Sequence, residues 1–155
     1  MTHKQQRVDK ENAQVVVRGD YVKTLDAIAD GDFCPFCEEH LAKHHKHPIL
    51  HKTEYWLLTH NAWPYGGSVF HLLFIARPHL EAIEAMPSEM VVDLHKLYQK
   101  VIAENAIMGG TLMIRSGNTA ITGASVNHLH AHLIVGSPRT EKAKPITALI
   151  GFNKE

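Results

Sequence analysis

The sequence predicts an α+β domain built around an antiparallel β-sheet, with one long helix and one or two short ones. Two observations lead to this fold class. Strand-length apolar runs lie on both sides of a single long amphipathic segment, and they are too few for a doubly wound parallel sheet. The composition agrees, because 45% of the 155 residues are hydrophobic and 21% are charged, as in a globular chain. A chain of this length fits one domain, since domains cluster around ~100–150 residues.

The long helix is expected to be capped by Ser88 and to end at Gly109-Gly110. Its predicted buried positions are Val91, Leu94, Tyr98 and Val101. A shorter amphipathic helix is expected from Asp20 to Gly31, because apolar residues recur there at helical spacing. The residues before it are mostly polar, so we expect the first 20 residues to be peripheral.

Strand-like patterns supply the predicted sheet. The expected strands cover residues 49–59, 70–75, 111–114 and 128–135. The second of these runs is apolar at nearly every position, which predicts burial on both faces. Residues 115–127 are rich in Gly, Ser, Thr and Asn and are expected to form a loop.

The charge balance argues against nucleic acid or a membrane as a partner. Lys plus Arg and Asp plus Glu number 16 each, so the chain has no net field to attract polyanions. Residues 55–76 carry no Asp, Glu, Lys or Arg, but their Pro, Gly and His residues are costly in lipid. The N-terminus shows no apolar segment typical of a signal peptide. We therefore expect a cytoplasmic protein.

The chain contains 13 histidines, and three of them alternate near its C-terminal end. A strand has a side-chain period of two, so His128, His130 and His132 would share one face. A polar, exposed strand face and a three-histidine metal site are both compatible with this pattern. Histidine is also the side chain that titrates near neutral pH, so catalysis is a third interpretation.

This segment resembles a family signature. His128-Leu129-His130-Ala131-His132-Leu133-Ile134 is similar to the His-φ-His-φ-His-φ-φ motif of the histidine triad nucleotide hydrolases and transferases. Gly123-Ala124-Ser125-Val126 resembles the family's Gly-Gln-Ser-Val, with Ala124 in place of Gln. The run from His71 to His79 resembles its central strand. The resemblance covers residues 32–136, so we expect a histidine triad domain at 32–155, including a C-terminal tail, and an N-terminal extension with a short helix at 1–31.

The resemblance implies a role for each matched residue. His130 matches the nucleophile that attacks the α-phosphorus and forms a nucleotidyl-histidine. The transition state of this attack needs hydrogen-bond donors for the phosphoryl oxygens. The matching candidates are His132, Ser125 and the loop amide of Gly123, with Asn118 as an additional phosphate contact. Asn61 matches the position that binds ribose. His71 is expected to be a packed, hydrogen-bonded histidine, and Trp63, Tyr65 and Phe70 are expected to line the base pocket or the core.

Cys34-Pro35-Phe36-Cys37 has the spacing that places two thiolates on one tetrahedral metal ion. The resemblance implies His79 and His128 as the other two ligands of a structural Zn²⁺. A local alternative uses two of His40, His44, His45 and His47 instead. A redox pair and two unligated cysteines are further alternatives. His128 as a zinc ligand would not shuttle a proton, so leaving-group protonation would fall to His132, solvent or the substrate.

These expectations combine into one functional hypothesis. The family's phosphate-transferring branches carry Gln at the position of His132, so the resemblance favours water as the acceptor. We expect a homodimeric hydrolase of a dinucleoside polyphosphate or a nucleoside phosphoramidate. A transferase or phosphorylase of the same family, and a zinc-dependent nucleotide-binding module with little turnover, are the alternatives.

Overall fold

The computed structural model describes residues 7–15 and 20–154 and centres on a five-stranded antiparallel sheet. The strands are β1 (Ile49–Lys52), β2 (Trp56–His60), β3 (Phe70–Ala76), β4 (Thr111–Ile114) and β5 (His130–Val135), in the order β1-β2-β3-β5-β4. The helices are α1 (Lys10–Val15), α2 (Tyr21–Asp30), α3 (Glu38–His44), α4 (Ser88–Glu104) and α5 (Thr119–Thr122), with a 3₁₀ turn η1 (Ile83–Ala85) before α4. The predicted fold class is therefore confirmed.

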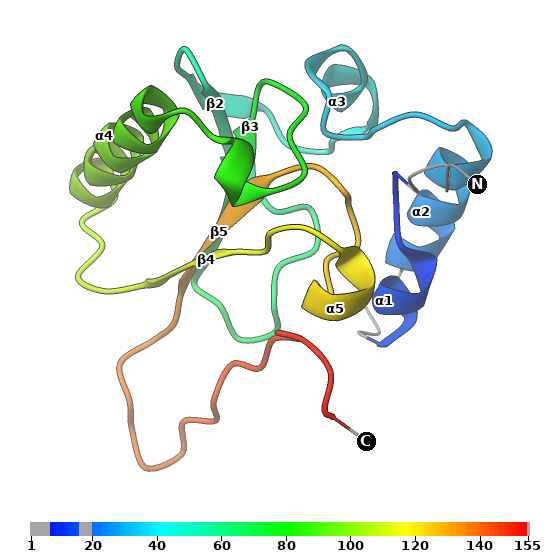
Figure 1. Ribbon diagram of the computed structural model, residues 1–155. Helices are drawn as coiled ribbons and strands as arrows, with labels where there is room; N and C mark the ends of the chain where they lie inside the picture. The colour runs from blue at the N-terminus through cyan, green and yellow to red at the C-terminus, as the bar shows by residue number, and fades with distance from the viewer. Residues whose placement is uncertain (1–6, 16–19, 155) are drawn as a thin grey trace.

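The sheet separates two environments. Helix α4 lies on one side of it, and α1, α2 and α3 lie on the other, as Figure 1 shows. Because side chains alternate along a strand, β5 directs Ala131 and Leu133 into the core that includes α4. Its His130 and His132 pair in register with Ile75 and Leu73 of β3 on the opposite face. The alternation inferred from the sequence thus places two of the three histidines on the face away from α4.

Helix α4 forms as predicted, but its buried face differs in part and its C-terminal end comes earlier than expected. Its buried residues are Met90, Leu94, Leu97 and Val101. Val91 is 50% exposed, so the predicted face was wrong by one position at that end. Ser88 is the first helical residue and not the cap, which is Pro87. The helix ends at Glu104, before Gly109, because the Asn105 side chain donates to the carbonyl of Val101.

The predicted strand at 49–59 is in fact a hairpin. β1 and β2 pair antiparallel, with Lys52 opposite Leu57. Thr53 closes the turn, because its hydroxyl accepts from the N–H of Trp56 and donates to Asp93 of α4. The carboxylate of Asp93 also accepts from the N–H of Tyr55. The turn falls at the polar residues Lys52-Thr53-Glu54, which interrupt the apolar run, so the prediction of one continuous strand was wrong there.

Residues 7–15 pack onto the domain, which corrects for them the expectation that the first 20 residues are peripheral; residues 1–6 and 16–19 lie outside the described part of the chain. Val8 and Ala13 are buried with Leu25 of α2 and Val126. Asn12 is only 4% exposed and donates two hydrogen bonds to backbone carbonyls beyond β4. The sequence of α1 is mostly polar, so it did not indicate that this helix packs onto the domain. The short α2 predicted at 20–31 is confirmed.

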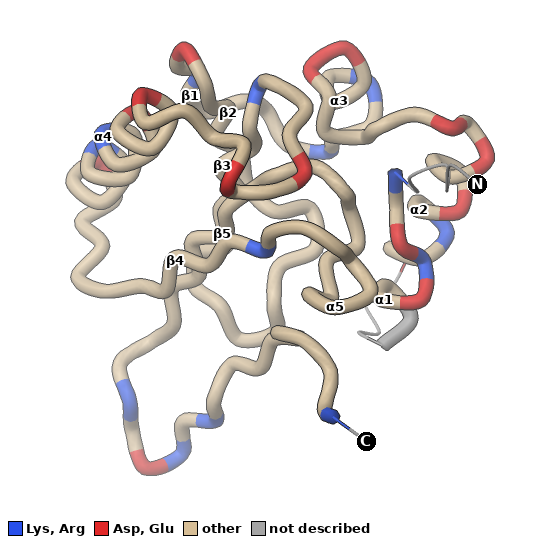
Figure 2. The backbone as a smooth tube through the Cα atoms, in the orientation of Figure 1, with Lys and Arg blue, Asp and Glu red and all other residues tan. Residues whose placement is uncertain are grey.

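The segment between β4 and β5 contains the short helix α5, where only a loop was expected. The last strand begins at His130, so His128 and Leu129 precede it. No helix among the described residues is long and apolar enough to cross a membrane. Residues of both charges occur along helices α1 to α4 and in residues 139–144 (Figure 2).

Candidate functional site

A cavity lies against the histidine face of the sheet. It is lined by His130 and His132 of β5, by the loop that follows β2, by residues 123–126 before β5, and by side chains of α2 and α3. Of the predicted nucleotide and phosphate contacts, Asn61, Gly123 and Ser125 line it. The cavity therefore joins the histidines to segments that are far apart in the sequence.

His130 is held in one tautomer. Its Nδ1–H donates to the backbone carbonyl of His128 over 2.7 Å, so the neutral ring keeps a lone pair on Nε2. Burial lowers the pKa of His130 to about 4, and the nearby positive charge of Arg115 adds to the effect. The ring is therefore neutral at pH 7, as a nitrogen nucleophile must be.

His132 is held in the opposite tautomer by a relay of hydrogen bonds. The backbone N–H of Tyr65 donates to Nδ1 of His71 over 3.0 Å, so the proton of His71 must be on Nε2. That nitrogen lies 2.9 Å from Nδ1 of His132 and donates to it. His132 consequently carries its own proton on Nε2. His71 is a buried, hydrogen-bonded positioning residue, in agreement with the role expected for it.

Arg115 lines the cavity although no pattern in the sequence predicted it as a site residue. It follows β4, and its Nη1 lies 3.3 Å from Nε2 of His132. Its Nη2 donates to the hydroxyl of Tyr65 over 3.0 Å and to the carbonyl of Leu149. Two N–H donors cannot satisfy each other, so His132 and Arg115 together favour an anionic acceptor between them. Only the pairing of β4 with β5 brings Arg115 here, and no spacing in the sequence signals it.

The loop before β5 provides a hydroxyl at the cavity but not every donor that was expected. Ser125 lines the cavity. The N–H of Gly123 is used within α5, where it donates to the carbonyl of Thr119 over 2.9 Å. Gly123 has φ of +72°, and a Cβ there would lie 2.7 Å from the side chain of Leu149, so glycine is required for geometry.

Asn118 lies outside the residues that line the cavity. Its Oδ1 accepts from the N–H of Ala120, so it caps α5.

Asn61 and two of the three predicted aromatic residues reach the cavity. Oδ1 of Asn61 accepts from the N–H of Trp63 over 2.9 Å, and the backbone N–H of Asn61 donates to the carbonyl of His71 over 2.8 Å. Trp63 and Tyr65 line the cavity, whereas Phe70 packs against the core with α4. These contacts hold the loop after β2 against the histidine relay.

A second group of side chains lies beside the cavity and has the composition of a metal site. The donor atoms of Cys34, Cys37, His79 and His128 all lie within 4.8 Å of one another. Nδ1 of His128 is 3.3 Å from Sγ of Cys34 and 3.1 Å from Nδ1 of His79, and Sγ of Cys37 is 3.4 Å from Nδ1 of His79. Donors around a tetrahedral Zn²⁺ lie roughly 3.3–3.8 Å apart, given Zn–N and Zn–S bonds of about 2.0–2.3 Å. The four residues therefore have the donor types and the approximate spacing that this ion requires.

The protonation of the group also suits a metal. Nε2 of His128 donates to the carbonyl of Ala76 over 2.6 Å, which leaves the lone pair of Nδ1 toward the thiols. Burial lowers the pKa of His128 to about 4, so this ring is neutral. Burial raises the pKa of the Cys34 thiol to about 12, and a bound metal is what would displace its proton.

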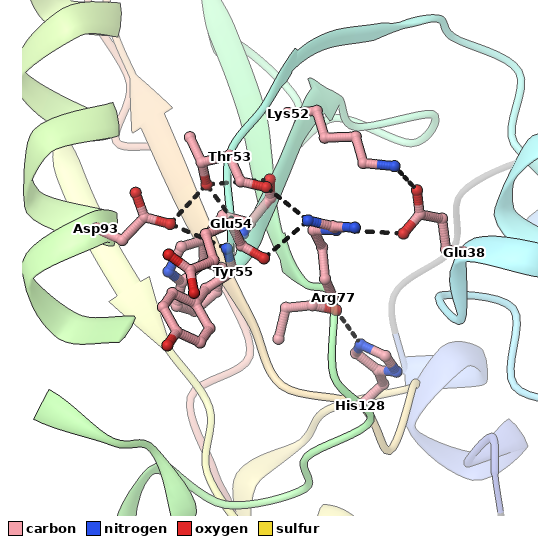
Figure 3. A network of polar contacts seen from close by, with 10 residues as sticks. Glu38, Lys52, Thr53, Glu54, Tyr55, Arg77, Asp93 and His128 are labelled. Atoms are coloured by element: carbon pink, nitrogen blue, oxygen red, sulfur yellow. Dashed lines mark hydrogen bonds and ion pairs between the residues drawn. The ribbon is translucent and has the colours of Figure 1, made fainter. Parts of the chain in front are cut away.

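A network of charged side chains fixes the surroundings of this group (Figure 3). Glu38 follows Cys37 directly and forms ion pairs with Lys52 and with Arg77, the latter over 3.2 Å. Arg77 also donates to the carbonyls of Thr53 and Glu54. The same end of β3 supplies the Ala76 carbonyl that holds His128. The network thus joins the start of α3 to the end of β3, where the Ala76 carbonyl orients the candidate metal ligand His128.

The arrangement bears on the alternatives raised by the sequence. His128 lies in the cysteine group and not in the cavity lining, and both of its ring nitrogens have partners there. The alternative metal site, in which two of His40, His44, His45 and His47 join the cysteines, does not form among the described residues. His45, for example, instead contacts Thr59 and the carbonyl of His60. The two cysteines are not joined in a disulfide.

Comparison with known proteins agrees with this geometry. The family model described as "HIT domain" matches residues 43–139, which is more than half of the chain. Among curated proteins, none matches significantly. A HIT family hydrolase from Clostridium thermocellum is 24% identical, with 75% of this chain and 98% of that chain covered and a TM-score of 0.56.

Two further solved structures share the fold. A hypothetical histidine triad nucleotide-binding protein from Sulfolobus tokodaii is 21% identical, with coverages of 78% and 82% and a TM-score of 0.55. A Zn-bound histidine triad family protein from Mycobacterium smegmatis is 18% identical, with coverages of 66% and 75% and a TM-score of 0.51. At these identities the likeness concerns the fold.

Proposed function

Because the chain belongs to the histidine triad (HIT) family, we propose that it hydrolyses a nucleoside 5′-phosphate derivative through a covalent nucleotidyl-His130. One observation carries the proposal. His130 is buried at the cavity with Nδ1–H donating to a backbone carbonyl, which leaves Nε2 as a neutral nucleophile. The substrate classes that suit this chemistry are dinucleoside polyphosphates and nucleoside phosphoramidates.

The proposed reaction has two displacements at the α-phosphorus. Nε2 of His130 forms a bond to phosphorus, and the P–O or P–N bond to the leaving group breaks. Water then attacks the same phosphorus, so that the nucleoside monophosphate leaves and His130 is regenerated. The pentavalent transition states carry negative charge on oxygens, for which Nε2–H of His132 and the guanidinium of Arg115 are the donors, with Ser125 as a third. Asn61 is assigned to the ribose.

Water as the acceptor is supported by the family resemblance at His132 and is tested by the products. The enzyme is incubated with adenosine 5′-phosphoramidate or diadenosine triphosphate in H₂¹⁸O, with and without inorganic phosphate. Hydrolysis predicts AMP that contains one ¹⁸O atom, and the yield of AMP should not depend on phosphate. ADP formed only when phosphate is present would instead identify a phosphorylase. No product from any nucleotide derivative, despite nucleotide binding, would favour the low-turnover binding module.

We also propose that Cys34, Cys37, His79 and His128 hold a structural Zn²⁺. Such an ion supplies folding energy by joining the segment before α3 to the loops around the sheet. His79 has the further support typical of a zinc ligand, because its Nε2 lies 3.3 Å from the carboxylate of Glu81. With His128 assigned to the metal, His132 is the histidine that remains beside Arg115 to interact with the leaving group.

A homodimer is the assembly we propose, with β4 at the contact. β4 is an edge strand with no charged residue, and its Leu112 is 41% exposed. Unprotected apolar edges tend to pair with another chain. The other edge strand, β1, carries Lys52 in an ion pair with Glu38, and a charge at an edge disfavours pairing with another chain. The charge difference between the two edges is what favours β4.

A further inference from the structure

The cavity has a wall that the matched family domain does not supply. Helix α2 ends at Asp30, before the matched residues 43–139 begin. It nevertheless lines the cavity with Tyr21, Thr24, Leu25 and Ile28. These positions are spaced i, i+3, i+4 and i+7, so they form one stripe along the helix. The whole inner face of α2 is therefore directed toward the cavity that contains His130.

Helix α2 is held firmly against the rest of the site. Leu25 and Ile28 are 2% and 5% exposed and pack with Val126, which follows Ser125. Tyr21 contacts Trp63 of the opposite loop, with ring centroids 4.8 Å apart. Through α1, the same segment is fixed to the loop before β5, because Asn12 donates to the carbonyls of Thr119 and Ala124 over 2.8 Å each. The helix is thus a fixed wall of the cavity.

The chemistry of the cavity changes from one end to the other. At the end with His132, Arg115 and Ser125, hydrogen-bond donors suit phosphate. On the side of α2 and α3, the lining is mostly apolar, with Leu25, Ile28, Phe36 and Leu41, and it includes the ring of His44. Phe36 meets the ring of His130 edge-on, with centroids 4.9 Å apart, so the apolar part begins directly beside the nucleophile. Thr24 also lines this wall, and its hydroxyl donates to the carbonyl of Asp20 within the same segment.

An apolar slot with few polar groups, next to a phosphate site, suits a planar heteroaromatic ring. We propose that α2 is the wall that recognises the nucleobase, so that the N-terminal segment determines substrate specificity. This inference rests on the proposed function only in taking the phosphate end to be at His130. It assigns to residues outside the matched family domain a contact with the substrate.

The test measures binding, so it does not depend on turnover. Dissociation constants for AMP, GMP, CMP, UMP and ribose 5-phosphate are measured by calorimetry on the full chain. The wild-type protein should bind at least one nucleoside monophosphate about tenfold more tightly than ribose 5-phosphate. In Thr24→Trp, the indole should fill the base site. The nucleotide affinity should then fall to within about twofold of that for ribose 5-phosphate, whose own affinity should not change.

Two further variants make the result decisive. Lys23→Trp places the same indole on the exposed side of α2, outside the cavity lining, and should bind like the wild type. Tyr21→Ala removes a ring at the cavity without adding volume, and should weaken nucleotide binding about three- to tenfold even if Thr24→Trp does not fold. A folded Thr24→Trp that binds nucleotides like the wild type would overturn the inference, and so would equal losses for nucleotides and ribose 5-phosphate. Continued hydrolysis in either case would leave the proposed function standing.

Discussion

Arg115 shows how one side chain can complete a site that the sequence only partly reveals. It contacts His132 and Tyr65, which belong to different strands and loops. The buried Nε of Arg115 has no hydrogen-bond partner among the described residues. A bound phosphoryl group would give the guanidinium an anionic partner. The histidines were predictable because they follow a period of two, whereas Arg115 reaches them only through the register of β4 with β5.

Replacing Arg115 should therefore impair the chemical step more than binding. Arg115→Gln removes the positive charge beside His132 and should lower kcat by roughly 10²-fold, the usual effect of losing one transition-state donor. Steady-state kinetics on the substrate identified by the ¹⁸O experiment provide the measurement. Arg139→Gln, in the exposed segment after β5, is the matched control and should have wild-type kcat. An unchanged kcat in Arg115→Gln would remove this residue from the mechanism.

The cysteines allow the metal assignment to be tested one residue at a time. Cys34→Ala removes one of four ligands and should release the metal and lower the thermal midpoint, because binding energy of a structural metal is partly folding energy. Zinc content by elemental analysis and thermal unfolding are measured on the same preparation. His51→Ala is the control, since half-buried His51 pairs with Glu104 away from the cysteines. Stoichiometric zinc retained by Cys34→Ala would contradict the assignment.

Among helices and strands, the sequence predicted which elements exist better than it predicted where they begin and end. Hydrophobic periodicity located α2, α4 and the two strands that flank the cavity, because burial of apolar faces forms these elements. It missed the reversal at Thr53, where side-chain hydrogen bonds to Asp93 and the backbone make the turn. It also missed α1, whose buried residues include a polar one, Asn12. What periodicity cannot detect is structure held by specific hydrogen bonds.

The hydrogen bonds of Asn12 should have a measurable energetic value. Asn12→Ala removes the side-chain donor of the buried Ala124 carbonyl and one of the two donors of the Thr119 carbonyl, which keeps the N–H of Gly123, and should lower the free energy of unfolding by about 2 kcal/mol. Asn105→Ala is the control, because Asn105 makes one part-buried bond to a helix carbonyl and should cost about 1 kcal/mol or less. Urea denaturation measures both. Equal losses would mean that α1 does not clamp the loop before β5.

At the scale of the whole molecule, the N-terminal segment connects the two groups of functional side chains. Nη1 of Arg7 lies 3.7 Å from the carboxylate of Glu81, the residue that also faces His79 of the cysteine group. Two residues later, the N–H of Asp9 donates to the carbonyl of Ser125, at the cavity. The metal group and the candidate catalytic cavity are therefore adjacent parts of one structure, and the segment outside the matched domain contacts both.

The proposed dimer predicts a difference between the two edges of the sheet. Leu112→Lys places a charge on the apolar edge at β4 and should convert the dimer into a monomer. Ile49→Lys makes the same kind of change on β1, where the exposed fraction of the side chain is similar, at 42%, and should leave the dimer intact. Light scattering coupled to size exclusion gives the molar mass. A dimer lost only in Ile49→Lys would place the contact at the other edge, and a monomeric wild type would contradict the assembly.

Covalent catalysis by His130 is the central claim, and trapping the intermediate tests it most directly. Wild-type protein and His130→Ala are mixed with adenosine 5′-phosphoramidate or diadenosine triphosphate, quenched in acid within milliseconds and analysed by intact-protein mass spectrometry. The same samples are assayed for AMP, so that an intermediate hydrolysed before the quench is still recognised by its product. Covalent catalysis predicts an adenylyl adduct on the wild type, and neither adduct nor AMP from a folded His130→Ala. AMP formed at the wild-type rate by His130→Ala would contradict it.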